Sequence, residues 1–256
     1  MARGTYHRGM AQEGRVARNR QRRSEAFLVA GLRVVTEEGI DALTMARLAG
    51  ELDTAVGSVY RYYASKDELV AAIQAHAIGR LHRSHDRSVE PVTAAVAARV
   101  DGEASVPVPV ELVRLVVLGR WFCAAAERYP EEVRLLQTVS ARRASTLSPA
   151  AATGLVPPTM ALVAAVSGTI DAAVLAGGLR PGDGLGRAIL WLMAFGGVFV
   201  ADDLEQYVPG VLGGGRLLRR LNADLLAGWG LAPAVVERVE QAVDDLAGTP
   251  PLVQPD

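Results

Sequence analysis

The sequence is poor in cysteine and in aromatic residues, and both shortages narrow the possible classes of protein. Cys123 is the single cysteine among 256 residues, so an intrachain disulfide is excluded and a reducing, cytoplasmic setting is favoured. Aromatic residues make up only 5% of the chain, although hydrophobic residues make up 50%. The abundant alanine, leucine and arginine favour helices, so the composition predicts an all-α protein large enough to bury a core.

The chain also lacks the short motifs that mark common enzyme sites. It contains no GxSxG, Walker, Rossmann or HExxH motif, so we expect no catalytic residues. His82 and Asp86 are four residues apart, with His85 between them, and such a spacing can share a metal ion. The same residues suit a solvated helix face, so we expect neither a metal nor another cofactor.

Long uncharged hydrophobic runs are scarce as well. Met160–Leu179 has the length of a membrane span, but Asp171 lies in its middle, and Ala188–Ala201 is too short to span. The N-terminus carries charge without an apolar core segment, which argues against a signal peptide. We therefore expect no membrane partner and interpret the apolar stretches as buried interface helices.

The formal net charge is only −1, but the charge is unevenly distributed. The first 24 residues contain seven arginines and one acid, Glu13, and residues 1–20 show no apolar periodicity. This predicts a flexible basic arm that contacts DNA phosphates. A disordered tail kept for solubility is the alternative. The arm residues expected to contact DNA are Arg15, Arg18, Arg20, Arg22 and Arg23.

The segment after the arm has the pattern of three short amphipathic helices. A helix is predicted over Asn19–Glu38, with Phe27, Gly31 and Val35 on one face and Gly39 as its stop. Thr44 is a candidate N-cap for a second helix. Asp53 and Thr54 interrupt that helix before a third, Ala55–Tyr63. Two short helices joined by a tight turn are the outline of a helix-turn-helix.

The remainder is also predicted to be helical. Ser65 and Glu68 form a capping box that opens a long helix to Ser88, and Pro91 predicts a domain boundary. We therefore expect a basic arm over residues 1–20, a helix-turn-helix domain over 21–90 and a helical domain over 91–256. Later helices are predicted over Glu111–Tyr129, Glu131–Ser145, Thr159–Gly178, Gly184–Glu205, Arg216–Gly228 and Pro233–Leu246.

The segment Leu43–Leu69, LTMARLAGELDTAVGSVYRYYASKDEL, resembles the signature of the TetR family of transcriptional regulators. The matching elements are a helix-opening Thr, an apolar-Ala pair, Gly-Ser-Val-Tyr, Tyr-Tyr and the final Ser-Lys-Asp-Glu-Leu. The turn departs from the family pattern, because Leu52-Asp53-Thr54-Ala55 stands where Ala-Gly-Val-Ser is usual. Asp tolerates the left-handed conformation, so the turn is expected to survive while the operator sequence differs.

The resemblance implies DNA contacts from the second and third helices. Small residues on the third helix allow close approach to a major groove, and hydroxyl and ammonium groups can donate to phosphates. The alternative is that the tyrosines merely pack the domain, and we accept it for Tyr63. The expected contacts are Thr44, Ala55, Val56, Gly57, Ser58, Tyr60, Arg61, Tyr62 and Lys66.

The C-terminal helices resemble the family less closely. The small-residue helices around Gly168 and Gly196-Gly197 resemble the paired helices that form the family's dimer, and one face of the first helix permits close helix approach. The resemblance therefore implies a homodimer interface at Ala161, Ala165, Gly168, Ala172, Gly196 and Gly197. Ordinary packing within the chain is the alternative. The expected lining of a site for an unidentified small-molecule effector is Trp121, Phe122, Met160 and Met193.

Together these features predict a dimeric DNA-binding regulator. The resemblance implies a repressor on a palindromic operator, and we expect a small, largely apolar ligand to release it. Two rivals remain: a ligand-independent DNA-binding protein, and an enzyme with an accessory helix-turn-helix.

Overall fold

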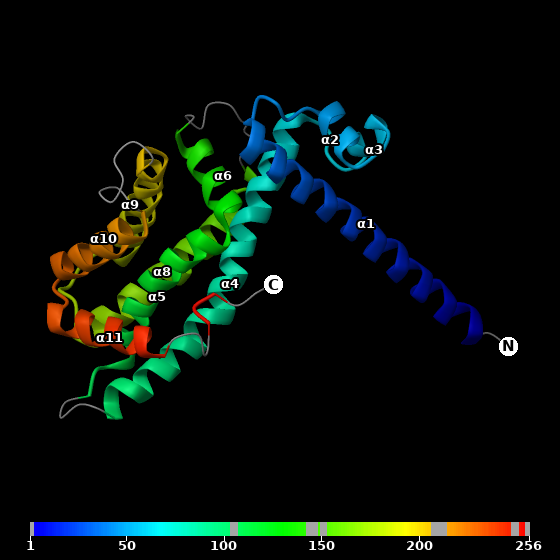
Figure 1. Cartoon of the computed structure of the whole chain (residues 1–256). Helices are drawn as coiled ribbons and strands as arrows, with labels where there is room; N and C mark the ends of the chain where they lie inside the picture. The colour runs from blue at the N-terminus through cyan, green and yellow to red at the C-terminus, as the bar shows by residue number, and fades with distance from the viewer. Residues whose placement is uncertain are drawn as a thin grey trace. The chain divides into compact units, whose positions relative to one another are not determined.

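The computed structural model describes residues 3–102, 107–141, 148, 153–205, 214–246 and 251–253. Throughout these ranges the regular structure is helical and no strand is found, which confirms the predicted fold class (Figure 1). The chain divides into two compact units. We call them the N-terminal unit, which takes in the chain up to His76, and the C-terminal unit, which takes in most of the chain from Ala77 onward.

The N-terminal unit is built from α1 (Arg3–Glu38), α2 (Met45–Glu51), α3 (Val56–Tyr60) and the beginning of α4 (Lys66–Gly102). The predicted apolar face of α1 is buried, with Phe27 fully inaccessible and Val35 nearly so. A Cβ atom on Gly31 would lie 2.5 Å from Ile73 Cδ1, so the missing side chain lets α1 approach α4 closely. These contacts join α1 to the start of α4 within one small core.

The basic arm is a helix rather than a flexible segment. Instead of beginning at Asn19, α1 begins at Arg3 and runs without a break into its packed half. Side chains 15–23 are all exposed, so this part of the helix has no apolar face. Helix extension from an existing turn costs far less than nucleation, and the arginine, alanine and glutamine there favour it. Apolar periodicity therefore gave no sign of this helix.

Local signals in the helix-turn-helix are confirmed in detail. Gly39 adopts φ +88° just past the end of α1, and Thr44 caps α2 by accepting a hydrogen bond of 3.0 Å from the Arg47 backbone N–H. Asp53 adopts φ 45° in the turn, as its tolerance of that conformation predicts. α3 is shorter than the predicted Ala55–Tyr63 and ends at Tyr60. The backbone N–H groups of Tyr62 and Tyr63 still donate to the Val59 carbonyl oxygen, so a turn follows the helix directly.

α4 differs from its predicted bounds at its far end. The Glu68 N–H donates to Ser65 Oγ at 3.1 Å, while the Glu68 carboxylate accepts from the Ala64 N–H instead of the expected Ser65 N–H. The helix then continues through Pro91 to Gly102, and the two units divide at His76–Ala77 rather than near Pro91. Pro91 is exposed, whereas Val92 and Val96 are buried on the helix face that packs into the core. This burial offsets the cost of an interior proline.

In the part of the chain that the structure describes, the C-terminal unit contains the rest of α4 and six further helices. α8 packs against both α5 and α9, and α10 packs against α9 and α5 (Figure 1). The predicted helices are all present with shifted ends, except α9, whose bounds match the prediction. The helices are α5 (Val110–Arg128), α6 (Pro130–Ala141), α8 (Val156–Leu175), α9 (Gly184–Glu205), α10 (Gly214–Trp229) and α11 (Pro233–Asp245).

Ion pairs, most of them partly buried, connect helices across this core. Arg120 on α5 is paired with Glu240 on α11, and also with Asp244 at 2.6 Å. Arg80 on α4 is paired with Glu132 on α6, whose carboxylate is almost fully buried. The Arg80 guanidinium also lies 5.0 Å from the centre of the Tyr129 ring. Removing one member of such a pair would leave an unpaired charge in the interior.

One helix among the described residues, α8, is long and apolar enough to cross a membrane by length and composition alone. Its most apolar window has a mean hydropathy of 1.5 and is 33% buried. Core helices of soluble proteins pass the same test, so this is weak evidence for a span.

We predict that Gly39→Ala lowers the free energy of unfolding by about 1 kcal/mol, because a Cβ is strained at positive φ. Gly50→Ala is the matched control: Gly50 lies inside α2, and no described atom lies within 4 Å of the added Cβ. That change should raise stability by about 0.5–1 kcal/mol. Urea denaturation of both variants measures the difference, and effects of equal sign would contradict the assigned helix end.

Candidate functional site

The position of α3 is set by aromatic packing against α1. Val59 is fully buried, and Tyr63 is 5% exposed, with its hydroxyl 2.9 Å from Ser24 Oγ on α1. The Phe27 ring lies 5.3 Å from the Tyr62 ring and 6.5 Å from the Tyr63 ring, measured between ring centres. Burial raises the pKa of Tyr63. The packing role inferred for Tyr63 is therefore what the structure shows.

The opposite side of α3 faces solvent. Val56 is 39% exposed and Tyr60 is 53% exposed, both unusual for such apolar side chains. Gly57 is also exposed, and a Cβ there would meet no described atom within 4 Å, so another molecule can approach the backbone closely. Arg61 is exposed and donates to Ser58 Oγ at 3.2 Å. This surface consists of small side chains, with the longer side chains of Tyr60 and Arg61 at its edge.

Two further predicted contacts lie beside the ends of neighbouring helices. Thr44 is exposed at the N-terminus of α2, where its hydroxyl oxygen accepts a backbone hydrogen bond and its hydrogen stays available to donate. Lys66 opens α4, and its Nζ donates a long bond of 3.5 Å to the Asp41 carbonyl oxygen. That bond is weak enough to exchange for a phosphate.

Tyr62 does not share the exposed setting of Tyr60. Its ring is half-buried, in contact with Phe27, and the Arg20 guanidinium lies 5.9 Å from the ring centre. Arg20 and Tyr62 therefore act together in holding α1 against the residues after α3. Nothing in the sequence indicates this difference, because Tyr60 and Tyr62 carry the same chemistry.

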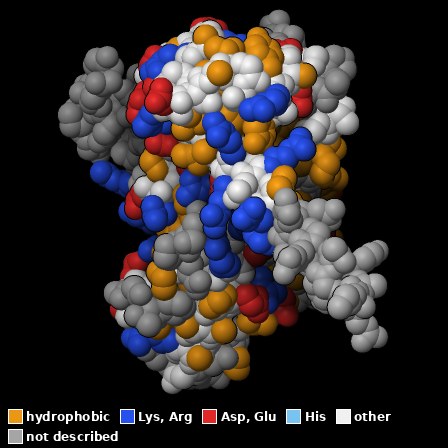
Figure 2. All heavy atoms as spheres, turned by 90° about the vertical axis from the view of Figure 1, so that its right-hand side faces the viewer, with side chains coloured by type: hydrophobic (Ala, Val, Ile, Leu, Met, Phe, Trp, Pro, Cys, Tyr) orange, Lys and Arg blue, Asp and Glu red, His pale blue; other side chains and the backbone are white. Residues whose placement is uncertain are grey.

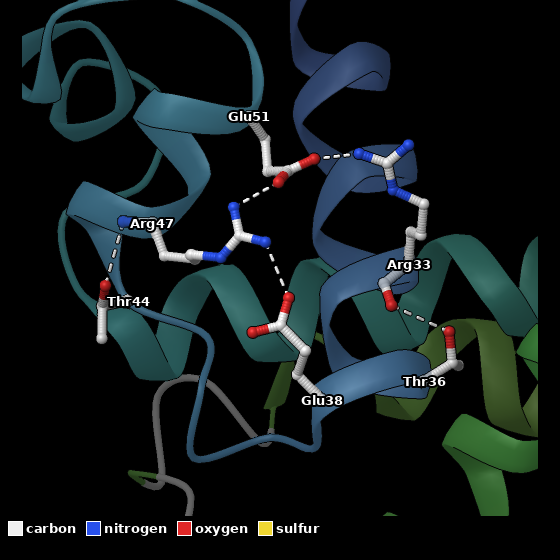
Figure 3. Close-up of polar contacts among 6 residues, drawn as sticks. All are labelled: Arg33, Thr36, Glu38, Thr44, Arg47 and Glu51. Atoms are coloured by element: carbon white, nitrogen blue, oxygen red, sulfur yellow. Dashed lines mark hydrogen bonds and ion pairs between the residues drawn. The ribbon is translucent and has the colours of Figure 1, made fainter.

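Sequence reasoning missed a charged network that fixes α2 to α1. The Arg47 guanidinium lies between two carboxylates, Glu38 at 2.7 Å and Glu51, and Arg33 pairs with the same Glu51 (Figure 3). Thr44 and Thr36 add hydrogen bonds at the edges of the network (Figure 3). The i, i+4 spacing of Arg47 and Glu51 was the one signal available in the sequence.

The arginines of the arm divide between two faces of α1. Arg15, Arg18 and Arg22 follow at intervals of three and four residues, so they share one exposed face. Arg20 and Arg23 instead turn toward α2 and α3, and Arg23 donates to Thr54 Oγ1 at 2.8 Å. Figure 2, viewed from the side on which α1 lies in Figure 1, shows lysine and arginine side chains gathered in a band.

Residues 27–73, which contain α2, α3 and the packed half of α1, match the family model described as bacterial regulatory proteins, tetR family. This segment is similar to the N-terminal domain of TetR-family regulators. The match confirms the resemblance seen in Leu43–Leu69. No curated protein gives a significant sequence match to the chain.

Solved structures of TetR proteins share the fold over most of the chain. A bacterial regulatory protein of the tetR family from Rhodococcus RHA1 is 22% identical and covers 82% of this chain and 97% of its own, with a TM-score of 0.53. A TetR-family transcriptional regulator from Agrobacterium tumefaciens is 11% identical and covers 82% of this chain and 98% of its own, with a TM-score of 0.55. The fatty acid degradation regulator FadR from Bacillus halodurans is 13% identical and covers 79% of this chain and 94% of its own, with a TM-score of 0.56. At these identities the likeness is one of fold.

Outside the TetR domain, the four residues expected to line an effector site do not come together. Trp121 and Phe122 lie inside the C-terminal unit with their ring centres 4.9 Å apart. Met160 is 48% exposed on α8 and Met193 is 61% exposed on α9, so both lie on the surface. The interior partners of Trp121 and Phe122 are instead His85, Trp191 and Phe195, which sequence reasoning did not select for this site.

The two methionines belong to an exposed apolar face of α8 and α9. On each helix its members recur every three or four residues, in a stripe on which Asp171 is the one charged side chain. Of the small residues expected at the dimer interface, Gly168 and Gly197 are exposed here, while Ala161, Ala165, Ala172 and Gly196 are half-buried beside it. The face consists of Val156, Met160, Ala164, Gly168, Asp171, Leu175, Leu185, Ile189, Leu190, Met193 and Gly197.

The histidines of α4 form no metal site in the described part of the chain, where no group of three or more potential ligands is placed to hold an ion. His85 Nδ1 lies 3.0 Å from Asp86 Oδ1, and His82 Nε2 lies 3.6 Å from the same oxygen. His85 also contacts Trp121, with 5.4 Å between ring centres, so it faces the aromatic interior.

Proposed function

We propose that this protein is a homodimeric transcriptional repressor that binds operator DNA through α2 and α3 and is released by a small molecule. The observation that carries the DNA-binding part is the exposed surface of α3. Val56 and Tyr60 are exposed on a helix whose other side is fully buried. A protein gains no stability from exposing such residues, whereas a recognition helix needs them to meet base edges.

The residues around α3 supply the phosphate contacts that fix a recognition helix in a groove. Thr44 offers a hydroxyl at a helix N-terminus, Lys66 offers an ammonium group, and Tyr60 offers a phenolic hydroxyl. Ala55, Val56, Gly57 and Ser58 present small groups toward the bases, and Arg61 can reach guanine. Tyr62 acts by positioning, through its contacts with Phe27 and Arg20.

The exposed face of α1 extends this surface. Arg15, Arg18 and Arg22 lie on a helix without acidic residues in its first turn. Like charges at i+3 and i+4 spacings repel, so an anionic surface along this face would stabilise the helix as well as bind it. DNA phosphates are the natural partner, since Arg20 and Arg23 fix the same helix to the α2–α3 surface.

The apolar face of α8 and α9 provides the surface for a second copy of the chain. Its large side chains are too numerous to be stable in water, and Gly168 and Gly197 let helix backbones approach. One α3 reads only a few base pairs, so useful specificity requires two copies on a two-fold symmetric operator. The cytoplasm is the compartment that suits this role.

Release by a ligand follows from population shift. A molecule bound in the C-terminal unit releases DNA only if it favours a conformation in which the two α3 helices are wrongly spaced. α4 begins beside the helix-turn-helix and ends in the C-terminal core, so it is the element through which binding can act. A ligand-independent DNA-binding protein remains the second candidate.

We predict that Lys66→Ala and Tyr60→Phe weaken operator binding with little loss of stability, because each removes one donor to a phosphate. The operator is first selected from a random duplex pool, and mobility-shift titrations at several salt concentrations then give the affinities. Each change should reduce the salt slope by roughly one. Arg83→Ala, which removes an exposed charge from the C-terminal unit, is the control. A pool without any enriched sequence, or unchanged affinity in both variants, would refute the assignment.

A second prediction concerns the arginine face of α1. Replacing Arg15, Arg18 and Arg22 together by glutamine should reduce the salt slope by roughly three and weaken binding most at low salt. The sequence preference should persist, and deletion of residues 1–18 should act in the same direction. The control replaces Arg216, Arg219 and Arg220 on α10, which are also exposed, with the same change in net charge. Equal affinities for wild type and variant at low and high salt would mean that this helix serves solubility alone.

A third prediction concerns the apolar face. Gly168→Leu should yield monomers or insoluble protein, and so should Gly196→Leu, because the larger side chain would obstruct close approach of a partner helix. In the described chain, an added Cβ at either position meets no atom within 4 Å. Gly228→Leu on α10, where the described surroundings are equally open, should remain dimeric. Light scattering at micromolar concentration measures the mass. Wild-type protein that is monomeric while binding the operator tightly would contradict the dimer.

A further inference from the structure

The interior of the C-terminal unit contains a continuous cluster of aromatic rings. The ring centre of Trp121 lies 5.4 Å from His85 and 4.9 Å from Phe122. Phe122 in turn lies 5.7 Å from Trp191 and 5.3 Å from Phe195. Phe122 and His85 are half-buried, whereas Trp121 and Trp191 are at most 1% exposed, so Phe122 and His85 are the more accessible rings of these four.

Several polar atoms in and around this cluster lack a hydrogen-bond partner among the residues that the structure describes. Both buried indoles, Trp121 and Trp191, have an Nε1–H without an acceptor, and His85 Nε2 is buried without a partner. Ser84 Oγ and Asn222 Oδ1, each in a side chain at most 1% exposed, are in the same state. Native interiors leave few such atoms, because a buried polar atom without a partner has lost its hydrogen bonds to water.

The chemistry of the open atoms is complementary. His85 Nδ1 lies 3.0 Å from the Asp86 carboxylate, which requires a hydrogen on Nδ1 and therefore leaves a lone pair on Nε2. Burial lowers the pKa of His85, which favours this neutral form at pH 7. Trp121 can only donate. His85 Nε2 thus needs a hydrogen-bond donor, and Trp121 Nε1–H needs an acceptor.

We propose that this cluster is the effector site and that its ligand is an aromatic molecule carrying a hydroxyl group. The hydroxyl oxygen accepts from Trp121 Nε1–H, and the hydroxyl hydrogen is donated to His85 Nε2. The aromatic body packs against Phe122 and its neighbours, since aromatic rings prefer edge and offset contacts at such distances. This inference rests on the proposed ligand-released function and gives the expected, largely apolar effector a defined polar group.

The test uses two probes of similar shape, 2-naphthol and 2-methylnaphthalene, with the full-length protein in equilibrium dialysis without DNA. We expect 2-naphthol to bind at least three times more tightly than 2-methylnaphthalene. Trp121→Phe keeps a ring but removes the N–H, so it should weaken 2-naphthol binding roughly 3- to 10-fold and leave 2-methylnaphthalene unchanged. His85→Phe should have the same selective effect and replaces Trp121→Phe if that variant fails to fold.

Trp229→Phe is the matched control. Trp229 lies at the edge of the cluster, 6.3 Å from Trp191, and its indole nitrogen is not among the open atoms. This variant should bind both probes as wild type does. Failure of 2-naphthol to bind, equal binding of the two probes, or equal losses in the Trp121 and Trp229 variants would each overturn the inference. Because DNA is absent, operator binding measured separately stays intact if only this inference fails.

Discussion

The burial of Phe27 against Tyr62 and Tyr63 is the contact on which the arrangement of the N-terminal unit depends. α3 has only five residues, and a helix of that length has no stability of its own in water. It keeps its conformation because Val59 and Tyr63 are buried and because the Tyr63 hydroxyl is bonded to Ser24 on α1. The surface that we propose for DNA is thus held in place from behind by side chains on the opposite, buried side of α3.

The N-terminal unit could be predicted from sequence wherever the determining interactions are local. The cap at Thr44, the glycine at position 39 and the left-handed Asp53 are each decided within a few residues, and all three are observed. The helical arm and the passage of α4 through Pro91 could not be predicted. The first is continued from a neighbouring turn, and the second is maintained by burial of Val92 and Val96 in a core formed by distant residues.

The C-terminal unit shows a different limit of sequence reasoning. α8 and α9 are apolar on every side, so periodicity does not distinguish a face toward the core from a face toward a partner. Met160 and Met193 were therefore assigned to an interior site, although both are exposed. Phe122 was expected to line the same site, but its neighbours Trp191 and Phe195 lie about seventy residues further along the chain, and only folding brings them together.

The chemistry of Cys123 has a practical consequence. Burial raises the pKa of its thiol to about 11, so at pH 7 only about one molecule in 10,000 carries the reactive thiolate. Burial and the small thiolate fraction together slow the reaction of this thiol with oxidants and alkylating reagents in the native chain. A thiol-reactive label would therefore react with a cysteine introduced on the protein surface much faster than with Cys123. Spectroscopic probes could then report the separation of the two α3 helices in a dimer with little background from the natural thiol.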